Sequence, residues 1–253
     1  LVTLPTVNGQ MIFGGMLRND LTAFIFRMLF LFAGAMTALI SVDAPTLGRA
    51  GEYYVILIAA VLGMGLMAAS ADLIMLYLAI EMTSIGLYAL AGFLRENDKS
   101  SEAGLKYFLF GAFTSSIMLY GFSLLYGFTG QTNLYTLAVA LIGAPLEAVV
   151  LALLLVLVGF GFKVSAVPFH YWAPDVYEGA PTPVTAFLAV ASKAAGFAVL
   201  IRVLMAVFPG IAGVWTMLIA VIAALTMTLG NVVALTQKNI KRLLAYSSIA
   251  QAG

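Results

Sequence analysis

Three charged side chains stand in the middle of long apolar runs of this 253-residue chain. Glu81 lies in LYLAIEMTSIGLY, Lys163 in VLVGFGFKVSAVPF, and Lys193 among the small residues of LAVASKAAG. A charge near the centre of a bilayer costs at least about 2.5–3.5 kcal/mol, so something must compensate for each. A buried lysine changes its protonation state readily, and a nearby carboxylate stabilises the ammonium form. These residue types predict a proton relay; the competing interpretation is buried ion pairs that hold helices in register.

Three further basic residues lie nearer the ends of apolar runs. Lys106 is about one turn inside its run and follows Glu102 by one turn, so a relay role and simple snorkelling to the interface both remain open. We expect Arg27 and Arg202, each within one to two turns of a run's end, to snorkel.

The segment 164–184 combines four prolines with a glycine and interrupts the pattern. Pro168 follows Lys163 by five residues, which predicts a distorted helix, and a broken helix in a membrane is tolerated where it lines a cavity. For the prolines from Pro174 onward we expect an ordinary turn outside the bilayer.

The same segment holds the chain's single histidine and two acids. His170, at the expected membrane edge, is either a proton entrance or an ordinary interfacial polar residue. Asp175 and Glu178 form either an acidic mouth or a solvated loop. Asp72, at the opposite side, is expected at the interface.

The composition indicates the elements that must position these residues. Hydrophobic residues make up 63% of the chain and charged residues 9%, which excludes an ordinary soluble enzyme, a disordered protein and a secreted scaffold. Unbroken apolar runs of helix-spanning length also exclude a porin-type barrel. The prediction is an all-α, polytopic transmembrane helix bundle forming a single membrane domain over 1–253. The expected spans are 21–42, 52–70, 72–94, 105–128, 148–170 (broken), 181–208, 214–235 and a partial span at 240–253.

The loops differ in charge between the two sides. Loops after the first, third, fifth and seventh spans carry six Lys or Arg residues, whereas the other side has only Arg18. By the positive-inside rule the basic side faces the cytoplasm, which places the N-terminal end on the non-cytoplasmic side. The first residue is Leu and the last apolar run stops without a cap, so we interpret the chain as an internal fragment.

The chain has no cysteine and one histidine. Disulfides and cysteine-ligated iron–sulfur clusters are therefore excluded within it. We expect no bound metal or redox cofactor and no nucleic-acid partner, since the net charge is +1.

Two long segments carry a family resemblance. GFKVSAVPFHYWAPDVYEGAPTPVTAFLAVASK (161–193) and GNVVALTQKNIKRLLAYSSIAQAG (230–253) resemble the antiporter-like membrane subunits of respiratory complex I. YLAIEMTSIGLYAL and SSEAGLKYFLFGA also fit, and the likeness covers about 20–253. It is closer to the N-type subunits of bacterial NADH-quinone oxidoreductase than to their L and M sisters.

The resemblance implies a fourteen-helix subunit of two inverted five-helix repeats, the first complete here and the second truncated. The family's proton-channel residues map onto Glu81, Lys106, Lys163 and Lys193, and His170 matches a histidine of the same motif. It further implies a multi-pass protein of the bacterial inner membrane that works with other complex I membrane subunits. NADH, FMN, iron–sulfur clusters and quinone would lie elsewhere in that complex.

Two other functions remain open at this point. A subunit of a multi-subunit Na⁺(K⁺)/H⁺ antiporter belongs to the same superfamily and would exchange cations without electron transfer. A non-conducting membrane scaffold with buried ion pairs would tolerate apolar replacement of the lysines.

Overall fold

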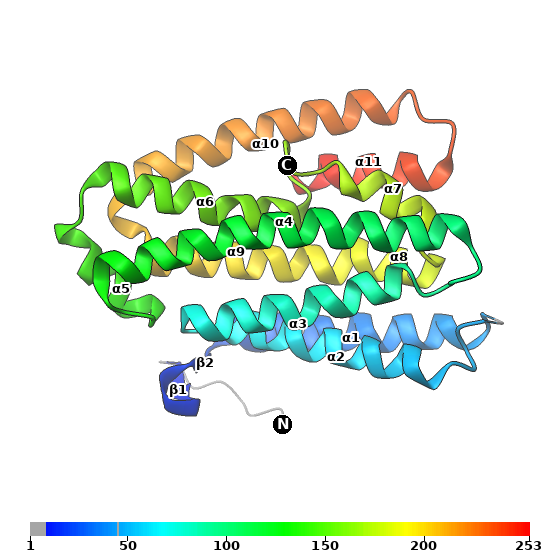
Figure 1. Cartoon of the computed structure of the whole chain (residues 1–253), viewed down its shortest axis with the longest axis horizontal. Coiled ribbons are helices and arrows are strands. Elements are labelled where there is room, and N and C mark those ends of the chain that lie inside the picture. Colours follow the sequence, from blue (N-terminus) through cyan, green and yellow to red (C-terminus); the bar gives the residue numbers. More distant parts are fainter. Residues whose placement is uncertain (1–8, 45) are drawn as a thin grey trace.

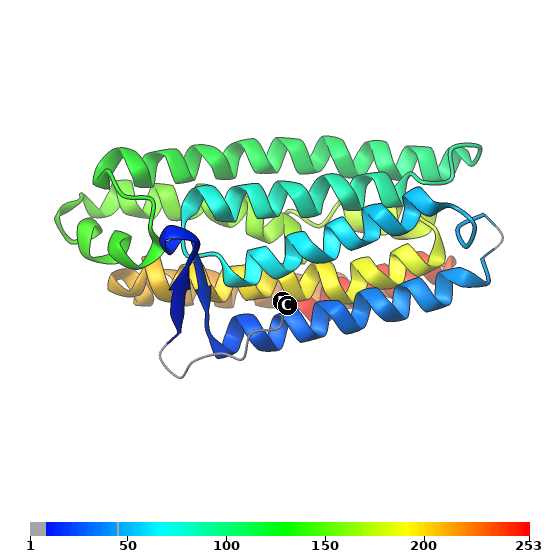
Figure 2. The same ribbon diagram turned by 90° about the horizontal axis from the view of Figure 1, so that it is seen from below.

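Seven helices that are long and apolar enough to cross a membrane run side by side in a computed structural model of the chain (Figure 1, Figure 2). The structure describes residues 9–44 and 46–253. The seven are α1 Leu21–Val42, α2 Gly51–Ala69, α3 Leu73–Ala91, α4 Asp98–Thr129, α6 Leu146–Val164, the combined helix Thr182–Val207 and the helix Pro209–Ala234.

A short β-hairpin precedes α1 at one end of the bundle (Figure 2). Strands β1 (Gln10–Ile12) and β2 (Leu17–Asn19) pair antiparallel around a 3₁₀ turn, Phe13–Gly15. The Met16 carbonyl accepts a 2.8 Å hydrogen bond from the Ala71 amide, so the hairpin is attached to the turn between α2 and α3.

Polar side chains begin the first and third spans. Asp20 accepts a 2.8 Å hydrogen bond from the Ala23 amide and so caps α1. Asp72 caps α3 through the Ile74 and Met75 amides, and the break between α2 and α3 falls at the polar residues where the sequence placed it. Asp72 is buried because it is part of this capped turn, and its expected place at the interface stays a prediction.

Helix α4 begins seven residues before the expected 105. Asn97 accepts hydrogen bonds from the Lys99 and Ser100 amides, and this cap turns the polar connector into helix. With 32 residues α4 is about 48 Å long, well beyond the roughly 30 Å hydrocarbon core. A helix of this length exceeds the apolar layer, and its polar first turns carry Asp98 and Lys99.

The segment 129–146, expected to be a loop, contains a short helix. Helix α5 (Leu134–Ala140) continues into a 3₁₀ turn at Leu141–Gly143. Asn133 caps α5 through the Tyr135 amide, and the Leu134 amide donates to the Ala71 carbonyl at 2.8 Å. These bonds fold α5 back onto the start of α3.

The fifth span breaks earlier than the sequence suggested. Helix α6 ends at Val164 instead of reaching 170: Ser165 adopts a left-handed conformation, and the Ala166 amide donates to the Gly161 carbonyl. Pro168 lies in the break, where it cannot donate a backbone hydrogen bond.

The expected turn beyond Pro168 is a buried helix. Helix α7 (Trp172–Gly179) carries Pro174 in its first turn, a position that proline tolerates. The indole of Trp172 donates to the Phe162 carbonyl at 3.1 Å, and its ring stacks on Tyr107 of α4 at 4.3 Å between centroids. This aromatic packing fixes α7 against α4 and α6.

The sixth span contains an irregular turn in its middle. Helix α8 (Thr182–Phe187) passes through a π-helical segment, Leu188–Ser192, into α9 (Lys193–Val207). A 3₁₀ turn, Pro209–Ile211, leads into α10 (Ala212–Ala234), and α11 (Ile240–Ala252) is the last helix. With 13 residues, α11 is too short to count as a spanning helix.

Candidate functional site

The end of α6 positions Lys163 in the protein interior. Lys163 is 4% exposed, and its Nζ donates a 2.6 Å hydrogen bond to Ser84 Oγ on α3. Within the described residues it forms no ion pair. A cation in the last turn of a helix is favoured by the helix dipole, so the end of α6 supplies part of the compensation.

Glu81 lies one helical turn before Ser84 on α3. It accepts a hydrogen bond from the Ser115 hydroxyl of α4 and is half-buried. Its carboxylate is within electrostatic range of Lys163. Of the two buried lysines, Lys163 is therefore the one that Glu81 can influence directly.

Lys193 begins α9, directly after the π-helical segment. It is 6% exposed, and its Nζ donates a 2.7 Å hydrogen bond to the Ser248 carbonyl of α11. π-helical turns inside α-helices occur frequently at functional sites, because they re-aim the side chains that follow. Like Lys163, Lys193 has no carboxylate partner among the residues that the structure describes.

A close helix contact brings the two lysines onto adjoining turns. Gly196 lies one turn after Lys193, and a Cβ added there would be 2.9 Å from Val164 Cγ1 and 3.1 Å from Lys163 Cβ. Only a glycine allows α9 to approach the end of α6 so closely. We call Glu81, Lys163 and Lys193 the buried row.

Hydroxyl groups surround the buried row, and sequence reasoning did not identify them. Tyr88 lies beside Ser84, and Tyr107 beside Ser192. Tyr177 of α7 lies beside Ser248. Serine and tyrosine in helices usually have a structural role, so the only sequence signal was the one-turn spacing of Ser84 from Glu81.

A second group of charges lies around α7, at the opposite end from the hairpin. Lys106 donates to Asp175 at 2.6 Å, and Arg242 reaches Asp175 at 2.6 Å and Glu178 at 3.2 Å. Lys99 pairs with Glu178 at 2.8 Å. We call these residues the α7 cluster; Glu102, which also contacts Lys106 at 2.6 Å, belongs to it. The cluster surrounds a cavity of about 100 Å³.

The two acids of α7 are held in their charged form. Burial raises the pKa of Asp175, but hydrogen bonds from Lys106 and Arg242 outweigh it, and the net shift is downward. The pKa of Glu178 is also lowered, mainly by its hydrogen bond with Lys99. Asp175 and Glu178 thus lie on a helix and pair with basic residues, which does not fit a solvated loop, and the acidic mouth stays a prediction.

His170 lies in the break between α6 and α7 and is 3% exposed. Its ring packs beside Tyr171 with 4.4 Å between centroids. The structure places it neither in the buried row's hydrogen bonds nor in the α7 cluster. His170 is buried because the break folds back into the protein, and its expected place at a membrane edge stays a prediction.

Arg202 contradicts the expectation that it snorkels. Both terminal nitrogens bind Asp20, at 2.9 and 2.8 Å, and Nη1 also donates to the Tyr135 hydroxyl at 2.7 Å. Burial raises the pKa of Asp20, but the hydrogen bonds from Arg202 and the Ala23 amide outweigh this effect, and the net shift is downward. Arg202 therefore links α9 to the start of α1. Within 9–44 and 46–253, no group of three or more His, Asp or Glu residues could hold a metal ion.

A family model described as NADH:quinone oxidoreductase/Mrp antiporter, transmembrane, matches residues 70–253. The chain belongs to this family. NADH-quinone oxidoreductase subunit N 2 of Chloroherpeton thalassium is 50% identical over 95% of this chain and 50% of its own length. The subunit N of Moorella thermoacetica is 53% identical over 90% of this chain and 48% of its length. The chain thus spans about half the length of the curated relatives it matches.

Solved structures show the same arrangement of helices. A chain of respiratory complex I from Thermus thermophilus is 41% identical with a TM-score of 0.80, covering 96% of this chain and 52% of that one. A chain of an archaeal membrane-bound sulfane sulfur reductase is 30% identical with a TM-score of 0.87, and the match covers 99% of this chain and 52% of that one. A chain of the Mrp complex from Dietzia is 26% identical with a TM-score of 0.82, and the match covers 99% of this chain and 28% of that one.

Proposed function

We propose that this chain is part of a proton-translocating membrane subunit of NADH:quinone oxidoreductase, of the N type. It would couple quinone reduction elsewhere in the complex to proton movement through the buried row. The observation that carries the proposal is the state of Lys163 and Lys193. Both are buried on adjoining turns and bonded to a hydroxyl or a carbonyl, with no carboxylate ion pair among the described residues.

The partners of the two lysines are suited to proton exchange. Ser84 accepts a hydrogen bond from Lys163 while its own proton goes to the Ile80 carbonyl. Rotation of the hydroxyl away from Ile80 would let Ser84 donate to neutral Lys163 instead. Glu81 lies one turn before Ser84 on α3, within electrostatic range of Lys163. A change in the position or charge of Glu81 would therefore shift the proton affinity of Lys163. Lys193 would pass the proton onward toward α11.

The α7 cluster is proposed as the entrance on the basic side. Its cavity lies beside the polar first turns of α4. Lys106, which the family resemblance places on the proton path, would act here as a fixed charge opposite Asp175. His170, in the break between α6 and α7, would lie between the cluster and the buried row.

The complete activity requires other subunits. NADH, FMN, iron–sulfur clusters and quinone would bind to those subunits, as the likeness to NADH-quinone oxidoreductase subunits implies. Its partners would be neighbouring membrane subunits in the bacterial inner membrane. The basic end, which includes Lys99 and Arg242, would face the cytoplasm, and the hairpin the opposite side.

A cation/proton antiporter subunit is the second candidate, because the family description and the Mrp likeness both include that class. The subunit N relatives are the more similar, at 50% and 53% identity against 26% for the Mrp chain. Copurification with quinone-site and iron–sulfur subunits supports the first function, and copurification with small antiporter subunits the second.

The test is proton pumping by the intact complex in sealed vesicles. The double variant Lys163→Ala/Lys193→Ala should lose all or most pumping per NADH oxidised, while the complex still assembles. The matched control is Lys238→Ala, which changes an exposed loop lysine. Full pumping by an assembled double variant would rule out the proposal and favour a non-conducting scaffold.

A further inference from the structure

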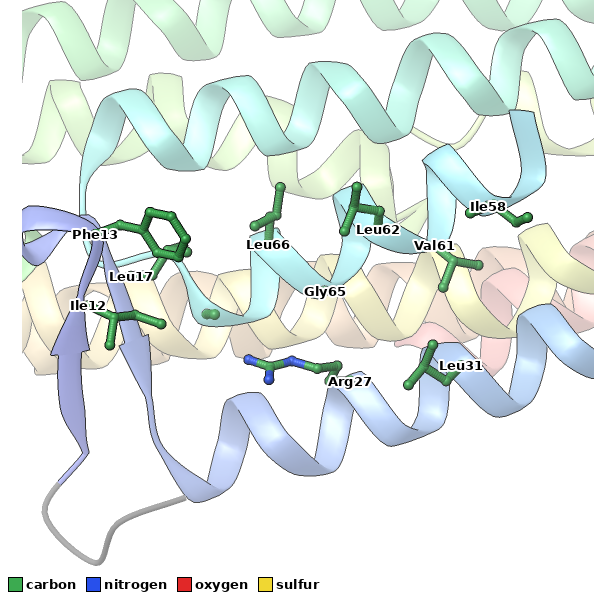
Figure 3. A pocket seen from close by; sticks show the side chains of 11 residues that line it. Ile12, Phe13, Leu17, Arg27, Leu31, Ile58, Val61, Leu62, Gly65 and Leu66 are labelled. Atoms are coloured by element: carbon green, nitrogen blue, oxygen red, sulfur yellow. The ribbon is translucent and has the colours of Figure 1, made fainter. Parts of the chain in front are cut away.

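An apolar groove of about 640 Å³ runs along the outer face of the bundle between α1, α2 and the hairpin (Figure 3). We propose that it binds one anionic phospholipid, with the phosphate on Arg27 and an acyl chain along α1 and α2. Nothing in the proposed proton relay uses this face of the molecule.

The shape of the groove follows from how α1 and α2 cross. At Gly34 the helices touch: a Cβ there would lie 2.6 Å from Val61 Cγ2. Two turns earlier, at Arg27, the opposing residue is Gly65, where an added Cβ would meet only Arg27 Cγ at 3.8 Å. The hairpin closes the groove at the end away from Gly34. The result is a cleft with a small-residue floor, open along one side.

The walls have the chemistry of a lipid-facing surface. Phe13, Ile58 and Leu62 line the groove and are 74%, 66% and 57% exposed. Such side chains are stable in hydrocarbon, and a hydrocarbon chain lying in the groove would cover them. Free inorganic phosphate would make no use of these walls.

Among the described residues that line the groove, Arg27 is the only charged one. Its guanidinium points along the groove toward the hairpin, the end at which α1 begins (Figure 3). That is the direction in which an arginine snorkels toward the headgroup layer. The nearby acid, Asp20, is bound by Arg202, and Arg27 forms no ion pair with any residue of 9–44 or 46–253.

An anionic phospholipid matches both the apolar walls of the groove and the positive charge of Arg27. A guanidinium binds phosphate oxygens through two parallel hydrogen bonds, and such charged bonds are the strong ones. The acyl chain would then extend from Arg27 past Leu31 toward the close contact at Gly34. A transmembrane helix of another subunit would fill the apolar cleft only if it also brought a carboxylate to Arg27.

The experiment measures phosphatidylglycerol retained by the complete protein complex after purification in detergent, by native mass spectrometry. Arg27→Leu should lower the retained lipid at least about tenfold, because the charged hydrogen bonds to the phosphate are lost. Arg27→Lys should retain an intermediate amount, because lysine binds phosphate only as a point charge.

A second variant tests the groove without changing charge. Gly65→Leu should fill the floor and release the lipid to a similar extent. Gly127→Leu makes the same change at an exposed position of α4 with no atoms within 4 Å, and should have no effect. Adding inorganic phosphate should not displace the lipid.

Unchanged lipid in both assembled variants, Arg27→Leu and Gly65→Leu, would overturn the proposal. So would displacement by inorganic phosphate, or a crosslink from a photoreactive residue at position 62 to a neighbouring polypeptide instead of to lipid.

Discussion

The buried row and the α7 cluster both contain lysines, but their surroundings differ. Lys163 and Lys193 lie in the interior and bond to a serine hydroxyl and a backbone carbonyl. Lys106 lies between Glu102 and Asp175, with 2.6 Å to each, and its side chain is 37% exposed. A lysine between two carboxylates is held in its charged form, whereas a buried lysine bonded to neutral groups can give up its proton.

Lysine therefore has a different role in each of the two environments. Partly exposed ion pairs contribute only about 0–1 kcal/mol each, so the α7 cluster orients α7 without making it rigid. A buried ammonium without a counter-ion is costly, and such a group is retained where its titration is used. The comparison therefore assigns proton transfer to the buried row and fixed charge to the cluster.

The largest expected effect comes from separating α6 and α9. Gly196→Leu would place atoms inside the contacts with Val164 and Lys163, where even a Cβ would be at 2.9–3.1 Å. Overpacking of this kind costs about 1–3 kcal/mol or more, and it would also move Lys193 away from Lys163. We expect a lower thermal midpoint and little pumping. Gly213→Leu, which meets no neighbouring atoms, is the control; pumping equal to the control would show that the close approach is dispensable.

Removing the hydroxyl beside Lys163 should have the next largest effect. Ser84→Ala deletes the acceptor of the 2.6 Å bond, worth about 1.5–3 kcal/mol for a charged partner. Pumping per NADH should fall at least about tenfold while assembly is kept. Ser116→Ala is the matched control, because that exposed hydroxyl bonds only the Ala112 carbonyl. Equal pumping by the Ser84→Ala and Ser116→Ala variants would show that the relay does not need the Ser84 hydroxyl.

Acidification should loosen the α7 cluster. The pKa values of Asp175 and Glu178 are lowered in the folded protein, so their contribution to stability is complete above their unfolded values of about 3.9 and 4.3. It is lost as the pH falls further, through the folded-state pKa values. Hydrogen exchange of α7, corrected for intrinsic rates, should be constant from pH 7 to 5 and rise below about pH 4. A rise that begins above pH 5 would contradict these shifts.

The smallest effect is expected from a single change in the cluster. Asp175→Asn removes the carboxylate shared by Lys106 and Arg242, but Glu102 and Glu178 still neutralise these two residues. We expect about 0.2–1 kcal/mol of destabilisation and pumping within about twofold of wild type. Loss of pumping in this variant, with normal assembly, would place a titrating group in the cluster and remove the distinction between the two regions.

The sequence identified the buried row because a charge inside an apolar run is conspicuous. Glu81, Lys163 and Lys193 could be named from the pattern alone, and the helical class followed from the composition. Which groups these residues contact could not be predicted. The bond from Lys163 to Ser84 joins residues 79 positions apart, and an uncharged serine in a helix gives no distinguishing signal.

The errors have the same physical origin. Arg202 was expected to snorkel because its acid, Asp20, lies 182 positions away in the sequence and the contact between them is tertiary. Helix α7 was expected to be a turn because it begins and ends near prolines, yet Pro174 fits its first turn and Trp172 packs on Tyr107. Local propensity was outweighed in both cases by packing between distant segments.

The most direct measurement compares the same conservative substitution in the two regions. Arginine keeps the positive charge but does not release its proton in a protein. In the assembled complex, Lys163→Arg should abolish or sharply reduce protons pumped per NADH oxidised. Lys106→Arg should pump nearly as wild type, because arginine can pair with Asp175 and Glu102 as lysine does. Normal pumping by Lys163→Arg, or its loss only in Lys106→Arg, would contradict the assignment of proton transfer to the buried row.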